Sequence, residues 1–328
     1  MVRARRIRTL SVCLLLTVAA SAVAILALGT GEFTIPPLDV VRALIGQGPP
    51  ADHLVVVEWR LPRVLLALLI GAALGLSGAI FQALTRNPLG SPDVIGFNTG
   101  AYTGVLLVAG SGYYVTALGA LIGGLATAIA VYLLAWKRGV QGFRLIIVGI
   151  AVSAVLGSLN EWFVTRADLQ TALAAAIWGQ GTLNGLGWAS VGPVVAGTLL
   201  GVAALLALGP RLSILEMGQD TAAALGVRVE RTRLAYLAVG VALTAVATAA
   251  AGPISFVALA APQLALRLTR TPGVALTPAA VMGAFLTIAS DWLAQHLFAP
   301  TQLPVGVVTV ALGGGYFVWL LYRQGRNA

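Results

Sequence analysis

The sequence predicts an all-α polytopic membrane protein with ten transmembrane helices, and three observations lead to this fold class. Of the 328 residues, 59% are hydrophobic and only 9% are charged, whereas soluble domains carry about 25% charged residues. Apolar stretches of roughly 20 residues, the length that a spanning helix requires, recur along the whole chain. They are continuous rather than alternating, which argues against a transmembrane β-barrel.

The first apolar stretch follows a basic start and could be a signal peptide. Its apolar run is longer than a typical signal core and more spans follow, so we expect a retained helix. The eighth stretch is short and contains Pro262, which a membrane helix tolerates where neighbouring protein satisfies the freed backbone. We predict spans at residues 9–29, 62–84, 94–110, 114–135, 144–164, 189–209, 233–250, 254–268, 276–298 and 305–322.

Three segments between the spans carry local signals. Residues 30–61 contain "IPPLDVVRALIG", which predicts a short amphipathic helix at the membrane interface. In residues 165–188, Asp168 is a good N-cap and Gly179 a good stop for a second short helix. Residues 210–232 form the longest segment on the predicted inner side.

The charge distribution predicts that both termini lie inside, because arginine and lysine concentrate in cytoplasmic segments. The outer segments hold only Arg42, Arg60, Arg63 and Arg166. The inner segments hold Arg3, Arg5, Arg6, Arg8, Arg86, Lys137, Arg138, Arg144, Arg211, Arg228, Arg231, Arg233, Arg267, Arg270, Arg323 and Arg326. In a soluble protein the net charge of +9 would suggest nucleic acid; here topology explains it, and no nucleic-acid partner is expected.

Small residues are dense, with 39 glycines. The G-x-x-x-G spacing, which lets helix backbones approach closely in lipid, occurs at Gly71/Gly75, Gly100/Gly104 and Gly119/Gly123. No linker divides the chain. We therefore predict one transmembrane domain over residues 1–328, with the 210–232 segment as part of it.

The inner segment contains a predicted helix too short to be stable alone. Asp220 is a good N-cap for a helix over residues 221–225, and Gly226 is a good stop. Nucleation cost dominates in helices below about 12–15 residues, so this one must pack on something. It either packs on its own bundle or docks onto a cytoplasmic partner.

Several functional classes find little support in the residues. The chain has no G-x-x-x-x-G-K-[ST] phosphate loop, so it is not expected to hydrolyse ATP. Ion coupling usually leaves ionisable residues in the bilayer, and the acidic candidates are only Glu161 and Asp291, near outer helix ends where local pairing is an alternative role. An intramembrane enzyme lacks a catalytic constellation. Cys13, His53 and His296 form no metal-ligand pattern.

The stretch "EWRLPRVLLALLIGAALGLSGAIFQALTRNPLGSPDVIGFNTGA" resembles the signature region of FecCD-type permeases, which serve ABC importers for iron–siderophores, haem and cobalamin. The resemblance continues in "FRLIIVGIAVSA", "AGPISFVALAAPQLALRLTR" and "QLPVGVVTVALGGGYFVWLL". It covers essentially the whole chain in colinear order. The wording is most similar to the second permease subunit of ferric-enterobactin importers.

This resemblance implies a type II ABC importer permease fold in a bacterial cytoplasmic (inner) membrane. Two permease subunits, here expected to be different chains, would surround a pathway. Two cytoplasmic ATPases and an extracytoplasmic siderophore-binding protein would complete the machine. ATP and Mg²⁺ would bind the ATPases, so no cofactor and no metal are expected in this chain.

The resemblance also assigns roles to residues at both ends of the bundle. Arg60 and Arg63 match rim positions that pair with glutamates of the binding protein; the alternative is that they anchor their helix by reaching lipid headgroups. A further rim arginine of some relatives is absent from "DWLAQHLFAP". The ATPase-coupling element maps onto Glu216, Met217, Gly218, Gln219, Asp220, Ala222, Ala223, Leu225, Gly226 and Val227.

The resemblance places the pathway along the fifth span, the loop before it and the tenth span. Gln141, Ser153 and Asn160 are candidate lining residues by polarity, with interhelical hydrogen bonding as the alternative. Asn98 and Thr99 would line it or satisfy a broken third helix. Gln263 replaces a histidine common among relatives, so no role of that histidine is carried over.

No residue set in the chain would ligand bare iron, so the expected cargo is a whole iron chelate. We therefore predict a non-catalytic permease subunit of an ABC importer for a ferric siderophore. The alternatives are the same machine carrying haem or cobalamin, and an ion-coupled secondary transporter.

Overall fold

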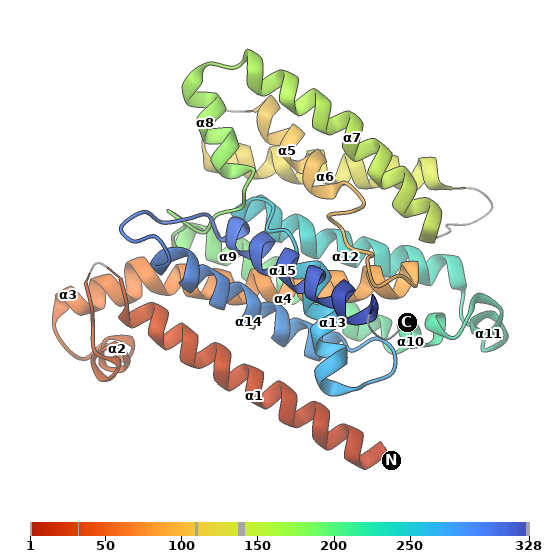
Figure 1. The fold of residues 1–328 in the computed structure, drawn as a ribbon, viewed down its shortest axis with the longest axis horizontal. Coiled ribbons are helices and arrows are strands. Elements are labelled where there is room, and N and C mark those ends of the chain that lie inside the picture. The colour runs from red at the N-terminus through yellow and green to blue at the C-terminus, as the bar shows by residue number, and fades with distance from the viewer. Residues whose placement is uncertain (1, 32, 109–110, 137–141, 326–328) are drawn as a thin grey trace.

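The computed structural model describes residues 2–31, 33–108, 111–136 and 142–325, and within these ranges every regular element is a helix (Figure 1). In order, the helices are α1 (Val2–Gly29), α2 (Pro37–Leu44), α3 (Pro50–His53), the π-helix η1 (Leu54–Arg60), α4 (Leu61–Thr85), α5 (Phe97–Leu107), α6 (Tyr113–Ala135), α7 (Gly142–Arg166), α8 (Leu169–Trp178), α9 (Trp188–Leu208), α10 (Arg211–Glu216), α11 (Gln219–Ala224), α12 (Val229–Ala251), α13 (Val257–Thr269), α14 (Leu276–His296) and α15 (Val305–Gly325).

Each of the ten predicted spans contains a helix, and seven of these helices in the described part of the chain are long and apolar enough to cross a membrane. The chain is therefore a multi-pass membrane protein. The others are α5, α13 and α15, whose described apolar part is Val305–Tyr316. At 1.5 Å per residue, α5 and α13 are about 16 and 20 Å long, shorter than the roughly 30 Å apolar core of a bilayer. The number of crossings stays a prediction.

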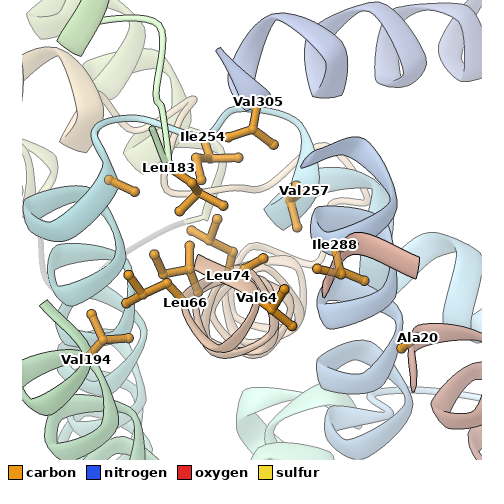
Figure 2. Close-up of a cluster of buried hydrophobic side chains, with 14 of the residues drawn as sticks. Ala20, Val64, Leu66, Leu74, Leu183, Val194, Ile254, Val257, Ile288 and Val305 are labelled. Carbon is orange, nitrogen blue, oxygen red and sulfur yellow. The ribbon is translucent and has the colours of Figure 1, made fainter. Parts of the chain in front are cut away.

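Helix α4 lies at the centre of the larger hydrophobic cluster. Leu66 and Leu74 of this helix are almost fully buried. In Figure 2 the helix is seen close to end-on, with Val194 of α9 on one side and Ile288 of α14 on the other. A helix that is apolar on most sides is expected to be largely buried, and most residues of α4 are buried.

The glycine pairs form close helix contacts, as their spacing predicts. A methyl group at Gly71 would collide with the backbone carbonyl oxygen of Gly283 on α14, and one at Gly75 with that of Ala279. Gly104 of α5 meets Gly119 of α6 in the same way. The spacing thus brings α4 against α14 and α5 against α6 at backbone distance.

The start of the second span differs from the prediction. The span was predicted to begin at residue 62, but helical backbone runs continuously from Pro50 to Thr85, and Pro62 lies in the first turn of α4. Because Pro62 lacks an N–H, the α-helical bond to the fourth preceding carbonyl is missing. The π-helical turns of η1 directly precede this position, and such bulges commonly absorb a break in the ladder. Arg60 and Arg63 therefore both project from one continuous helical segment.

The helix ends gather in two groups. Figure 1 shows the beginning of α1 and the end of α15 at the same end of the bundle as α10 and α11, with α2, α3 and α8 at the opposite end. The two groups are those that the charge distribution separates, and which of them faces the cytoplasm stays a prediction. Lys137, Arg138 and Arg326 of the charge argument lie outside the described residues.

Both short helices predicted between the spans are present. Helix α2 occupies the "PLDVVRAL" stretch and buries Val40 and Ala43. Helix α8 begins after Asp168, whose carboxylate accepts a hydrogen bond from the Thr171 backbone N–H, and ends at Gly179. Hydrogen bonds from Thr171 lower the pKa of Asp168 below its ordinary value, because they stabilise the charged carboxylate.

Candidate functional site

Arg60 is held at the outer group of helix ends by uncharged partners. Its Nη1 donates to the carbonyl oxygen of Leu28 at 2.7 Å, and its Nη2 donates to that of Phe33 at 2.6 Å. The side chain thereby joins η1 to the end of α1 and the segment that follows. Its fork remains partly accessible.

Arg63 has a different environment three residues later. Its Nε and Nη2 each lie 2.9 Å from a carboxylate oxygen of Asp291 on α14, which forms a bidentate ion pair. Its Nη1 donates to Gln302 Oε1 at 3.1 Å. The Arg63 side chain is 15% exposed and that of Asp291 is 0% exposed. Asp291 thus has the local pairing role, and the choice between docking and headgroup anchoring for the two arginines stays a prediction.

At the opposite end, α10 and α11 form a compact hairpin on the predicted coupling segment. The prediction that Asp220 caps the helix is wrong: α11 begins at Gln219 with Gly218 as its N-cap, and Asp220 lies in the first turn. Gly218 has a φ of +124°, which a glycine adopts easily, so the chain turns earlier than expected. A carboxylate in the first turn still favours the helix dipole.

The end of α11 agrees with the prediction. Gly226 has a φ of +78° and donates its N–H to Ala223 O at 2.9 Å. The Val227 N–H donates to Ala222 O at 3.0 Å. These two bonds define a Schellman motif. Ala222 is fully buried in the second hydrophobic cluster, so one face of the helix packs on its own bundle.

Two polar contacts fix α10 to the bundle. Glu216 accepts a hydrogen bond from the Val274 N–H at 2.9 Å, which joins α10 to the loop between α13 and α14. Arg86, at the end of α4, donates from Nη2 to Leu215 O at 2.9 Å. The Glu216 carboxylate therefore contacts its own bundle, and its part in ATPase coupling stays a prediction.

The other face of the coupling segment is exposed. Met217 is 66% exposed and Leu225 is 61% exposed, although both are large and apolar. Gln219, Asp220 and Ala223 are also exposed, and Gly226 lies beside them. If the predicted orientation holds, this face meets water rather than lipid. Exposed apolar residues in such a place commonly mark a protein interaction surface.

The predicted pathway residues come together in part. Asn98, Thr99 and Asn160 line one pocket of about 580 Å³ between α5, α7 and the residues after α12, together with Glu161 and Ser255.

Asn160 also joins helices, which was the alternative role. It donates from Nδ2 to Thr99 O at 3.1 Å and accepts from Thr103 Oγ1 at 2.7 Å. Ser153 donates to Gly149 O of its own helix and lies against Gly96 rather than in the pocket. Gln141 lies outside the described residues. Lining of a pathway by these residues stays a prediction.

Asp93 is a residue that the sequence analysis missed. It precedes α5, and its carboxylate accepts hydrogen bonds from the Asn98 side chain and the Phe256 backbone N–H. Phe256 is the N-cap of α13 and has a φ of +69°. Thr248 of α12 donates to Asn98 Oδ1 at 3.2 Å. Asp93 thus connects the beginnings of the two short helices, and it lies one residue before the predicted third span.

Gln263 is engaged within the bundle. Its Nε2 donates to Gln82 Oε1 at 2.7 Å, and Gln82 Nε2 donates to Leu259 O at 3.0 Å. The pair lies beside Arg86 and Glu216 in a pocket of about 340 Å³ near the coupling segment. Within the described ranges, no group of three or more His, Cys, Asp or Glu side chains could hold a metal ion.

Comparison with known proteins gives relatives over nearly the whole chain. The ferric enterobactin transport system permease protein FepG of Escherichia coli (strain K12) is 53% identical over 323 residues, covering 98% of each chain. The iron(3+)-hydroxamate import system permease protein FhuG of Bacillus subtilis (strain 168) is 36% identical, covering 91% of this chain and 92% of the relative. The hemin transport system permease protein HmuU of Yersinia pestis is 36% identical, covering 81% and 82%.

A solved structure of a metal-chelate type ABC transporter in an inward-facing conformation has the same fold. Its TM-score is 0.85 at 27% identity, with 95% of this chain and 99% of that chain covered. The family model described as the FecCD transport family matches residues 8–323. This chain belongs to the FecCD transport family.

Proposed function

We propose that this chain is a permease subunit of an ABC importer that moves a ferric siderophore across a bacterial cytoplasmic membrane. The observation that carries the proposal is the 53% identity to a ferric enterobactin permease over 98% of both chains. The likeness to a metal-chelate type ABC transporter supports the same machine. Haem is the competing cargo, because a hemin permease is also a relative.

The partners in this proposal are a second, different permease chain, two cytoplasmic ATPases and a siderophore-binding protein. The exposed face of α10 and α11, with Met217 and Leu225, supports docking of an ATPase at this end. The partly accessible rim around Arg60 supports docking of an acidic binding protein at the other. Arginine suits this role because its planar fork binds carboxylates.

Reconstituted transport tests the proposal. The assembled transporter in proteoliposomes, with its ATPases and binding protein, is expected to accumulate iron-labelled ferric enterobactin only with ATP inside. An ATPase variant that cannot hydrolyse ATP is the control. Uptake of haem but not of ferric enterobactin would show that the proposed cargo is wrong. Uptake driven by an ion gradient without ATP would show that the protein is not part of an ABC importer.

Crosslinking tests the ATPase surface. Leu225→Cys in a Cys13→Ser background is expected to crosslink to a single-cysteine ATPase, with a yield that changes with nucleotide. Leu169→Cys, exposed at the opposite end of the bundle, is the matched control. Equal yields at the two positions would contradict docking at α10 and α11.

A further inference from the structure

The sites of Arg60 and Arg63, the two rim arginines, differ in net charge although the residues lie only three positions apart. Arg60 donates only to the uncharged carbonyl oxygens of Leu28 and Phe33. Among the residues that the structure describes, no carboxylate lies within ion-pair distance of Arg60, whereas Arg63 is paired with Asp291. The Arg60 site therefore keeps a full positive charge, and the Arg63–Asp291 site is neutral.

Asp291 is built to hold this pair. Its side chain is fully buried, and both carboxylate oxygens contact Arg63 at 2.9 Å. Gln295, one helical turn later, donates from Nε2 to Asp291 Oδ2 at 2.9 Å. A buried carboxylate is tolerated only when it is paired and hydrogen-bonded, and Arg63 supplies the only cation in ion-pair range in the described chain.

The donor inventory points the same way. A guanidinium has five N–H donors, and the contacts of Arg63 use three of them, two on Asp291 and one on Gln302. The edge of the Arg63 guanidinium formed by Nε and Nη2 is fully used, because both nitrogens donate to the Asp291 carboxylate. Arg60 uses two donors on two different nitrogens, and its Nε remains outside these bonds.

We infer that Arg60 carries the docking charge of this rim, and that Asp291 is a positioning residue which neutralises Arg63 and fastens it as a link between α4 and α14. Asp291 thereby sets how many positive charges the rim presents to an acidic partner. The inference rests on the proposed docking of a binding protein at this rim. The inference gives different roles to Arg60 and Arg63, to which the family resemblance had assigned the same role.

The experiment measures affinity between the assembled transporter in nanodiscs and its cognate binding protein over a series of salt concentrations. Arg60→Gln is expected to weaken binding about tenfold at low salt and to flatten the salt dependence, because one partly exposed, unpaired positive charge is lost. Arg63→Lys keeps the charge opposite Asp291 but removes the fork, and is expected to bind within about twofold of the wild type. Arg42→Gln is the matched control, since Arg42 is another outer arginine, exposed and paired with Asp39.

Two variants that change Asp291 separate an effect on charge from an effect on protein stability. Asp291→Asn leaves Arg63 with uncompensated charge, so binding at low salt is expected to strengthen and its salt dependence to steepen. A purely structural role of Asp291 would not produce that steepening. The double variant Arg63→Gln with Asp291→Asn removes the pair as a unit and is expected to bind like the wild type.

The outcomes separate this inference from the docking proposal. Loss of binding in Arg63→Lys or in the double variant as large as in Arg60→Gln would overturn the inference while docking stands. An unchanged salt dependence in Asp291→Asn would also overturn it. If Arg60→Gln and Arg60→Glu bind like the wild type while the Arg63 variants lose binding, the inference is wrong and docking stands. If the Arg60 and Arg63 variants all bind like the wild type at every salt concentration, docking at this rim itself is wrong.

Discussion

Asp93 illustrates how one residue can connect segments that are far apart in the sequence. Its carboxylate accepts from Asn98 in the same turn and from the Phe256 N–H more than 160 positions later. Helix N-termini carry partial positive charge, and here two of them, those of α5 and α13, lie near one carboxylate. Asp93 therefore supports the two helices that are too short to span the bilayer.

Replacing Asp93 by Ala is expected to lower the free energy of unfolding by about 1–3 kcal/mol, because the Phe256 N–H loses its acceptor in the bundle. Thermal unfolding of the purified protein in detergent measures this. Asp93→Asn keeps an acceptor oxygen and is expected to lose less. Equal melting temperatures for the two variants would contradict the role assigned to this carboxylate.

For single residues, the sequence predicted which positions would matter but not which residues they would contact. The charge rule identified Arg60 and Arg63 as outer exceptions, and resemblance assigned them a common role. Their partners, two carbonyl oxygens for one and Asp291 for the other, depend on how α4 packs against α1 and α14. Such contacts span 228 residues in the case of Asp291 and leave no local pattern in the sequence.

At the scale of single helices, close contacts at glycines determine which helices pack together. The spacing of Gly71 and Gly75 predicted a close contact, and the structure identifies α14 as the partner. The sequence could not choose that partner, because G-x-x-x-G describes one face only. Cap geometry was predictable where a side chain dominates, as at Asp168, and failed at Gly218, where a positive φ starts α11 two residues early.

Gly71→Ala is expected to destabilise the protein by about 1–3 kcal/mol, because the added methyl group has no space beside Gly283 O and Thr287 Oγ1. Gly192→Ala is the matched control: this helical glycine of α9 has no heavy atom within 4 Å of the added carbon. Melting temperatures of both variants measure the effect. A drop in Gly192→Ala as large as in Gly71→Ala would show that packing is not the cause.

At the scale of the whole molecule, composition and charge predicted an all-helical membrane bundle. All ten apolar stretches became helices, and their ends separate into two groups as the arginine distribution requires. The segments before α5 and α13, residues 86–96 and 252–256, contain the helix-breaking residues Pro88, Pro92 and Pro253, which keep both helices short. The backbone of these segments turns within the bundle, where other segments satisfy it.

Cysteine labelling of intact cells tests the orientation. In a Cys13→Ser background, Leu169→Cys is expected to react with a membrane-impermeant maleimide added outside. Leu225→Cys, at the other group of helix ends, is expected to react only after the membrane is opened. Labelling of both positions from the same side would contradict the predicted topology.

The Glu216–Val274 hydrogen bond has a consequence for communication across the membrane. Val274 lies two residues before α14, and Asp291 lies near the far end of the same helix. A 21-residue helix is about 30 Å long, close to the thickness of the apolar bilayer core. Along this length α14 is fastened to α4 by the Gly71 contact and by Arg63. A displacement of α10 that preserves the hydrogen bond would therefore also move α14 and, through the contacts at Gly71 and Arg63, the end of α4 that carries Arg63.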